Sequence, residues 1–258
     1  MGNMEYRSAT VISNEQIAKN IFMLVLQAES GQIVLPGQFV QIKTNAKNCI
    51  LPRPISVSDY EAVTGLLTLV IQEKGPGTAA LCSLQQNCSI EILWPLGNGL
   101  EIPQNHKKIW LYGAGLGLAP MLCAARKWAG NVTAFCGYRN ADAAFYFDEL
   151  KSICNNVIIT TDDGSYGEKG FLIDAVKTKL QTDTPDLIFA CGPTPALAAL
   201  KTLPENIQEI THVSLEQRMA CGYGVCRVCT CQTTREDKFT RICTDGPVFP
   251  LAEVVFPC

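Results

Sequence analysis

The sequence is poor in histidine and in charged residues. Its two histidines, His106 and His212, are too few for a histidine-rich metal site. Charged residues make up 17% of the chain and hydrophobic residues 47%, a composition that buries a core and argues against disorder. The net charge is −3, and there is no basic stripe to neutralise phosphates. We therefore expect a folded protein that does not bind nucleic acid.

The chain also lacks a convincing targeting or membrane segment. Residues 1–11 show no basic stretch followed by an apolar run, and Tyr6 stands where a myristoylation motif requires Ser or Thr. The longest uncharged run, residues 109–125, is barely long enough for a membrane span, and its glycines and Pro120 favour a strand, a turn and a helix start. The thirteen cysteines then suggest a reducing cytoplasm, where they serve as thiols or metal ligands.

Hydrophobic periodicity and turn residues divide the chain into three parts, residues 1–102, 103–213 and 214–258. In the first part, proline and glycine turns separate short strands expected at 21–26, 39–43, 66–72 and 90–93. The only candidate helix there spans residues 79–86. Short strands with regular turns predict a closed antiparallel barrel.

The second part changes to an alternation of strands and helices. Strands are expected at 108–112, 132–137, 157–161 and 187–190. Helices are expected at 119–129, 148–153, 171–180 and 195–200. This alternation predicts a parallel sheet covered on both faces.

Six of the thirteen cysteines fall in the third part, where their spacing is informative. Cys221, Cys226 and Cys229 form a C-x4-C-x2-C pattern, and Cys243 follows at a distance. This is the plant-type arrangement of a 2Fe–2S cluster. We predict that these four thiolates bind such a cluster. Cys231 is then a nearby non-ligand, because four ligands are already present.

Two glycines between the cysteines suit this interpretation. Gly222 and Gly224 allow a loop to wrap closely around a cluster while its amides point at the sulfurs. Structural zinc is the alternative, although zinc favours two C-x2-C pairs and only Cys226 and Cys229 form one. Unligated thiols are a further alternative. A part this small needs a metal to support its fold.

A glycine cluster lies between the first strand and the first helix of the second part. Gly113, Gly115 and Gly117 would let the backbone approach a pyrophosphate, and the helix start would offer unpaired amides. The spacing is G-x-G-x-G rather than G-x-G-x-x-G, so a turn without a ligand is the alternative.

A second turn, Cys191-Gly192-Pro193, follows the strand expected at 187–190. Ligands of open parallel sheets bind outside the carboxyl ends of the strands, so both turns point to one crevice. Residues 162–165 follow another strand and either border this crevice or form an ordinary loop.

Together these motifs resemble those of the ferredoxin–NADP reductase superfamily. The segments occur in the order typical of it: Arg53-Pro54-Ile55-Ser56, Gly77-Thr78, Pro95-Leu96-Gly97-Asn98, the glycine turn and Cys191-Gly192-Pro193. The cysteine pattern with residues 243–249 narrows the resemblance, over the whole chain, to the electron-transfer subunits of dihydroorotate dehydrogenase B. It implies a multidomain β and α/β fold with an FAD-binding β-barrel (1–102), an NAD-binding α/β domain (103–213) and a 2Fe–2S domain (214–258).

The resemblance also implies roles for individual residues. Arg53 would contact the FAD pyrophosphate together with Gly77 and Thr78, and a guanidinium suits phosphate. Ser56 would form a hydrogen bond near the reactive flavin nitrogen. The residues expected along the flavin ring are Val70, Ile71 and Gln72. Pro76 departs from the pattern, since a basic residue is expected there. Cys191 is either close to the nicotinamide or a buried thiol without function.

The family's partner is an FMN-containing catalytic subunit that interconverts dihydroorotate and orotate in pyrimidine synthesis, in a heterotetramer of two of each subunit. Electrons would run between NAD and this partner through FAD and the cluster. One rival is the small subunit of NADPH- and ferredoxin-linked enzymes, which commonly has aspartate where Cys221 stands. Another is a zinc-stabilised binding module without redox function.

Overall fold

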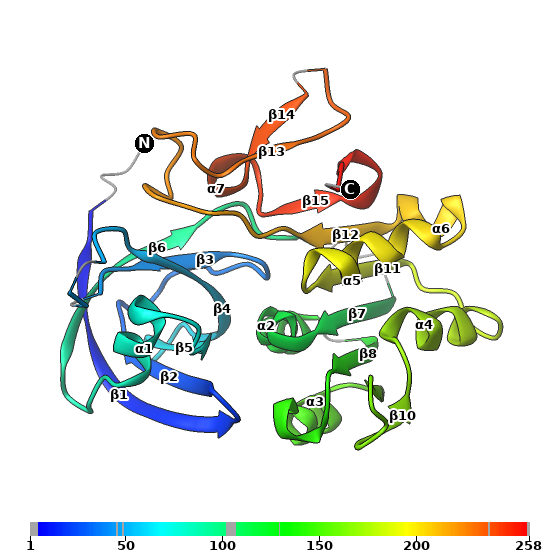
Figure 1. Cartoon of the computed structure of the whole chain (residues 1–258), viewed down its shortest axis with the longest axis horizontal. Helices are drawn as coiled ribbons and strands as arrows, with labels where there is room; N and C mark the ends of the chain where they lie inside the picture. Colours follow the sequence, from blue (N-terminus) through cyan, green and yellow to red (C-terminus); the bar gives the residue numbers. More distant parts are fainter. Residues whose placement is uncertain are drawn as a thin grey trace.

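The computed structural model describes residues 5–44, 46–47, 49–101, 107–128, 130–236 and 238–256. It contains a barrel, a sheet with helices on both faces and a small cysteine-bearing tail (Figure 1). The expected boundary between residues 102 and 103, the expected helix end at Ala129 and His106 lie outside the described residues. The division into three domains stays a prediction.

The first region is a closed antiparallel barrel, as the sequence predicts. The strand order is β1-β2-β5-β4-β3-β6. The strands are β1 (Arg7–Ala18), β2 (Ile21–Gln27), β3 (Phe39–Ile42), β4 (Arg53–Glu61), β5 (Leu66–Gln72) and β6 (Ser89–Leu96). Alternate residues point into the core, and Leu67, Leu69 and Ile71 of β5 are fully buried there.

Three elements of the barrel differ from the expectation. Strand β1 was not expected because it is largely polar and buries only Ala9 and Val11 in the core. Strand β4 was not expected either. The helix expected at 79–86 is α1 (Pro76–Cys82). Pro76 suits the first helical position, where a backbone N–H would have no helical partner. The Thr78 hydroxyl accepts hydrogen bonds from the backbone N–H groups of Lys74 and Gly75 at 2.9 and 3.1 Å.

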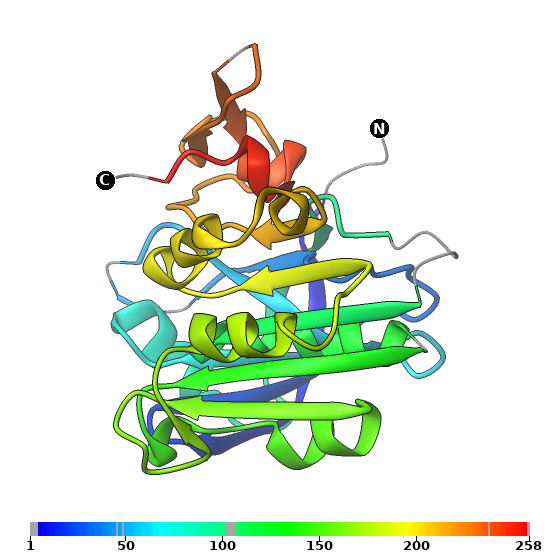
Figure 2. The same cartoon turned by 90° about the vertical axis from the view of Figure 1, so that its right-hand side faces the viewer.

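The second region is a seven-stranded sheet with the order β10-β9-β8-β7-β11-β12-β15. The strands are β7 (Lys108–Ala114), β8 (Asn131–Tyr138), β9 (Asn156–Thr161), β10 (Glu168–Lys169), β11 (Leu187–Cys191), β12 (Thr211–Ser214) and β15 (Val248–Pro250). Neighbouring strands are parallel except β12 and β15. Figure 2 shows the green and yellow strands running in one direction.

Helices cover both faces of this sheet, as predicted. They are α2 (Ala119–Lys127), α3 (Phe147–Ile153), α4 (Leu172–Leu180), α5 (Thr194–Ala199) and α6 (Glu205–Glu209), with short 3-10 turns η1 (Gly115–Leu118), η2 (Ala141–Ala143), η3 (Leu200–Thr202) and η4 (Leu251–Glu253). Ile109 and Leu111 of β7 pack with α2 and α3, whereas Trp110 and Tyr112 pack with α4 and α5. Helix α2 lies between the sheet and the barrel (Figure 1).

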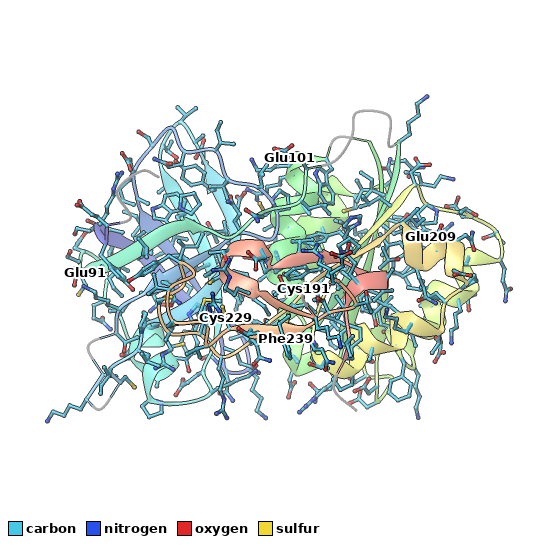
Figure 3. The ribbon with its side chains drawn as sticks, turned by 90° about the horizontal axis from the view of Figure 1, so that it is seen from above. Glu91, Glu101, Cys191, Glu209, Cys229 and Phe239 are labelled. Carbon is cyan, nitrogen blue, oxygen red and sulfur yellow. The ribbon has the colours of Figure 1, made fainter. Side chains whose placement is uncertain are left out.

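The tail contains β13 (Thr230–Gln232), β14 (Phe239–Arg241) and α7 (Ile242–Asp245) before it enters the sheet as β15. The Asn98 side-chain amide donates a hydrogen bond to the Thr244 carbonyl oxygen at 2.7 Å, which joins the tail to the segment that follows the barrel. Seen from above, the tail lies across the junction of the barrel and the sheet (Figure 3). Among the described residues, no helix is long and apolar enough to cross a membrane.

Candidate functional site

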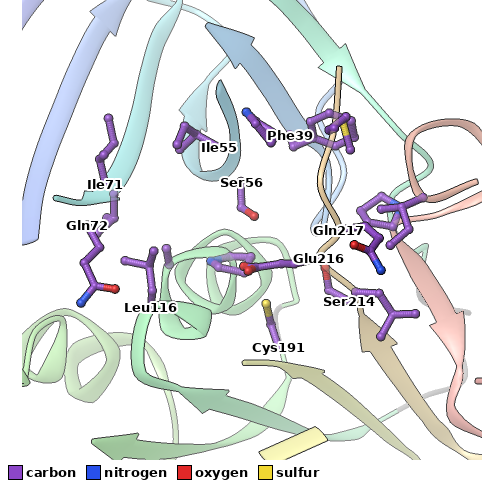
Figure 4. Close-up of a pocket in the computed structure, with 18 of the residues that line it drawn as sticks. Phe39, Ile55, Ser56, Ile71, Gln72, Leu116, Cys191, Ser214, Glu216 and Gln217 are labelled. Carbon is purple, nitrogen blue, oxygen red and sulfur yellow. The ribbon is translucent and has the colours of Figure 1, made fainter. Parts of the chain in front are cut away.

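A pocket lies where the barrel, the sheet and the tail meet (Figure 4). Residues 54–56 of β4 and 70–72 of β5 form its barrel wall. Thr78 lines it from α1, and Cys191 lines it from the end of β11. Most of the residues predicted for the flavin therefore share one cavity, although they come from separate elements.

Arg53 and Gly77, also predicted at the flavin, touch each other. A Cβ atom on Gly77 would lie 2.8 Å from Arg53 Nε, so glycine leaves room for the guanidinium in this position against the start of α1. One Arg53 nitrogen donates to the Leu51 carbonyl oxygen at 3.1 Å. Its Nε is buried without a partner among the described residues. This unused donor fits an anionic phosphate.

The two glycine-containing turns pack against each other. β7 and β11 are neighbours with Gly113 opposite Cys191, so both turns leave the same edge of the sheet. A Cβ on Gly117 would overlap the Cys191 carbonyl group and lie 2.6 Å from the nitrogen of Gly192. Gly115, by contrast, has a φ of +54° and open space around its Cα. Gly117 thus allows the turns to touch, and Gly115 faces a ligand-sized space.

That space is a second cavity at the carboxyl ends of the parallel strands. Gly115 and Pro193 line it from the two predicted turns, and Asp162 lines it from the end of β9. Arg139 at the end of β8 was not singled out from the sequence. This second cavity lies where the sequence predicted a crevice, since ligands of open parallel sheets bind outside the carboxyl ends of the strands.

Cys191 points into the first pocket opposite Ser56 (Figure 4). Burial raises the pKa of its thiol, the nearby Glu216 raises it further, and the Ser214 side chain forms a hydrogen bond with it. Burial by surrounding protein also raises the pKa of Glu216, although Lys74 acts in the opposite direction.

Ser214, Glu216 and Gln217 line the pocket but were missed in the sequence. They belong to no motif. The available signal was their position at the end of β12, because ligands gather at the carboxyl ends of parallel strands.

The four predicted cluster ligands lie together as two pairs. Backbone N–H groups of Cys221 and Cys226 each point at the other's sulfur at 3.5 Å. Cys229 and Cys243 are buried and form a side-chain hydrogen bond. Among the described residues, no three His, Cys, Asp or Glu side chains are grouped to hold one metal ion. Two thiol pairs match a cluster in which each of two irons takes two thiolates.

The chemistry of these thiols differs between the pairs. Burial alone would raise the pKa of Cys221, but hydrogen bonds from the backbone of Cys226, Tyr223 and Val225 outweigh it and lower the pKa to about 7. Burial, with the neighbouring Cys229, raises the pKa of Cys243 to about 12. The loop therefore directs amides at sulfur, as Gly222 and Gly224 led us to expect, and both have a positive φ.

The cysteine loop is stabilised by an ion pair, between Arg241 and Asp245, that was not predicted from the sequence. Arg241 donates a hydrogen bond to the Gly224 carbonyl oxygen at 3.2 Å and pairs with Asp245 at 3.2 Å. Met219 and Ile242, close in the chain to the cysteines, line the pocket. Residues next to the cysteines in the chain therefore form part of the pocket wall.

Comparison with known proteins agrees with this geometry. Residues 216–255 match the iron–sulfur cluster binding domain of dihydroorotate dehydrogenase B. The electron transfer subunit of dihydroorotate dehydrogenase B (NAD(+)) from Listeria monocytogenes serotype 4a is 36% identical over 95% of this chain and 96% of that protein. The subunit of the same name from Fusobacterium nucleatum is 33% identical over 97% of this chain and 99% of its own length.

Solved structures share the fold. An NADH-dependent reduced ferredoxin-NADP oxidoreductase has a TM-score of 0.85 at 28% identity, covering 99% of this chain and 92% of that one. Phthalate dioxygenase reductase has a TM-score of 0.64 at 15% identity, covering 89% and 87%. The extent of the sequence identity shows that this chain belongs to the family of dihydroorotate dehydrogenase B electron transfer subunits.

Proposed function

We propose that the chain passes electrons between NAD and an FMN-containing dihydroorotate dehydrogenase subunit, through FAD and a 2Fe–2S cluster, in cytoplasmic pyrimidine biosynthesis. The observation that supports this most is that Met219 and Ile242, which are close in the chain to the cluster cysteines, line the pocket. FAD exchanges a hydride with NAD and single electrons with a cluster, so it supplies the link between them.

The chain's own residues would bind and orient FAD in the first pocket. Arg53 has the unpaired Nε for the pyrophosphate, and Gly77 leaves room for it. Residues 70–72 and Ile55 would lie along the flavin ring, with the Ser56 hydroxyl free to form a hydrogen bond at its edge. Thr78 stabilises the turn before α1 and so fixes the position of Gly77.

NAD would bind across the glycine turn and the second cavity. Gly115 offers the open backbone for its pyrophosphate, and Gly113 and Gly117 let the turn pack closely. Pro193, in the turn after β11, lines the same cavity, and Gly192 packs against Ala114 of the glycine turn. Cys191 and Ser56 face each other across the pocket, which is where the nicotinamide would meet the flavin (Figure 4). Preference for NAD over NADP rests on the family.

The cluster would be held by Cys221 and Cys226 on one iron and by Cys229 and Cys243 on the other. The amide hydrogen bonds to Cys221 favour a thiolate there, which is the form that binds iron. Cys231 lies outside both pairs and stays a predicted non-ligand. A single zinc ion would need all four sulfurs at one centre.

One observation favours a second candidate function. The similarity to the ferredoxin-linked oxidoreductase covers nearly the whole chain. A small subunit of an NADPH- and ferredoxin-linked flavin enzyme is therefore the alternative. Such subunits commonly have aspartate at the position of Cys221, so the cysteine at this position favours the dihydroorotate enzyme.

The test is to isolate a tagged copy from its native cells without oxygen and to assay dihydroorotate-dependent reduction of NAD, with NADP as the control. We expect activity with NAD, in a brown complex with an FMN protein and a mass of two copies of each subunit. A brown preparation that lacks this activity but uses NADPH and ferredoxin would move the function to the alternative. A colourless preparation would contradict both.

A further inference from the structure

Gln41 on β3 is a fully buried polar residue without a hydrogen-bond partner. Its exposed fraction is 0%, and neither Nε2 nor Oε1 has a partner among the described residues. Leaving a buried amide unpaired is costly, because no hydrogen bond compensates for its lost hydration. Folded proteins keep few such groups, so an unpaired buried amide calls for an explanation, such as a group that binds beside it.

The position of Gln41 on its strand connects the pocket to the tail. Val40 and Ile42 point into the barrel core. Because side chains alternate along a strand, Phe39 and Gln41 share the outer face. Phe39 lines the first pocket and packs in the core that contains Cys229 and Cys243. Gln41 is therefore next along a face that leads away from the flavin pocket.

The cysteine loop lies directly on Gln41. A Cβ atom on Gly222 would be 2.7 Å from Gln41 Cγ and 2.9 Å from Gln41 Nε2. Gly222 follows Cys221 and has a φ of +83°. The absence of a side chain at residue 222 thus allows the amide to reach the backbone that carries the first ligand.

We propose that Gln41 Nε2 donates a hydrogen bond to an inorganic sulfide of the bound cluster and thereby raises the cluster's reduction potential. This inference rests on the proposed cluster. Reduction adds negative charge to the sulfurs, so a donor stabilises the reduced state more than the oxidised one. The cysteine loop already supplies backbone donors to Cys221. Gln41 adds a donor from the barrel and is a positioning residue between the flavin region and the cluster.

The experiment is a redox titration of the purified chain with its cofactors, following the cluster by electron paramagnetic resonance and the FAD by absorbance. Gln41→Met removes the donor at similar volume, and Gln41→Glu replaces it with a charged acceptor of the same shape. We expect both to lower the cluster potential, Gln41→Glu more, while the FAD potential stays unchanged. The control is Ile42→Val, which alters the barrel core beside Gln41 and should leave the cluster potential unchanged.

An unchanged cluster potential in Gln41→Met, or an equal shift in Ile42→Val, would overturn the inference. A wild-type chain without a 2Fe–2S signal would instead refute the proposed cofactor. If Gln41→Met does not retain the cluster, the wild-type chain with 15N in its glutamine side-chain amides decides. A weak nitrogen coupling to the reduced cluster that disappears in Gln41→Glu supports the hydrogen bond, and no coupling rejects it.

Discussion

The barrel and the cysteine tail are stabilised in different ways. The barrel closes on itself around an aliphatic core that includes Leu24, Leu26 and Leu67. The tail exposes many of its apolar side chains, namely Tyr223, Val225, Val228 and Phe239. Its buried residues, such as Ile242 and Phe249, belong to a core shared with the sheet. The tail therefore depends on its neighbours and, as proposed, on its cluster, whereas the barrel also has an aliphatic core of its own.

The largest effect should come from Cys229→Ser. Cys229 is 1% exposed, and serine replaces a soft thiolate ligand with a hydroxyl that binds iron poorly. We expect the cluster absorbance and paramagnetic signal to disappear while FAD stays bound in the barrel. Cys231→Ser is the matched control, because we predict that Cys231 is not a ligand. Loss of the cluster in Cys231→Ser, with retention in Cys229→Ser, would reverse the assignment.

Gly117→Ala tests the close packing between the glycine turn after β7 and the turn after β11. The added methyl group meets the backbone of Cys191 and Gly192, which cannot move aside as a side chain can. We expect a loss of about 2–3 kcal/mol in the free energy of unfolding in urea, and weaker NAD binding. Gly115→Ala has open space and only an unfavourable φ, so about 1 kcal/mol is expected. Equal losses for the two variants would show that the turns do not touch.

Ser58→Ala tests the interface between the barrel and the helical layer of the sheet. Ser58 Oγ donates to the Ala119 carbonyl oxygen at 2.9 Å and lies 3.0 Å from the Tyr146 hydroxyl, and all of these groups are buried. Leaving them unpaired should cost about 1–2 kcal/mol in the free energy of unfolding. Ser83→Ala removes an exposed hydroxyl bonded to the Ala80 carbonyl oxygen and should change stability by less than about 0.5 kcal/mol. A Ser58→Ala effect no larger than this control would contradict the prediction.

The smallest effect concerns pH. Burial raises the folded-state pKa of Glu216 above its ordinary value of 4.5, so the unfolded chain releases this proton first as pH rises. Below pH 4.5 Glu216 is protonated in both states and does not destabilise the fold. The free energy of unfolding then falls as pH rises from 4.5 through the folded-state pKa of Glu216. Glu216→Gln should lack this fall when unfolding in urea is compared near pH 4.5 and at neutral pH. The exposed Glu209→Gln is the control and should keep it. A wild-type chain that gains stability over this range relative to Glu216→Gln would show the opposite sign.

Local patterns were enough to predict much of the fold. The strand expected at 66–72 is β5, because its alternating Leu and Ile residues specify both strand and buried face. The barrel, the parallel sheet and its two helical layers were also predicted. Strand β1 was missed because its partners β2 and β6, rather than its own hydrophobicity, define it.

The cysteine pattern, the glycine turns and the alternation of strands and helices could be read from the chain alone, because each depends on residues close together in sequence. The three-dimensional fold, by contrast, brings Gly77 onto Arg53, Glu216 to Cys191 and Gly222 onto Gln41. These contacts join residues far apart in sequence. They depend on strand register and on how the tail packs across the barrel and the sheet, which no local pattern specifies.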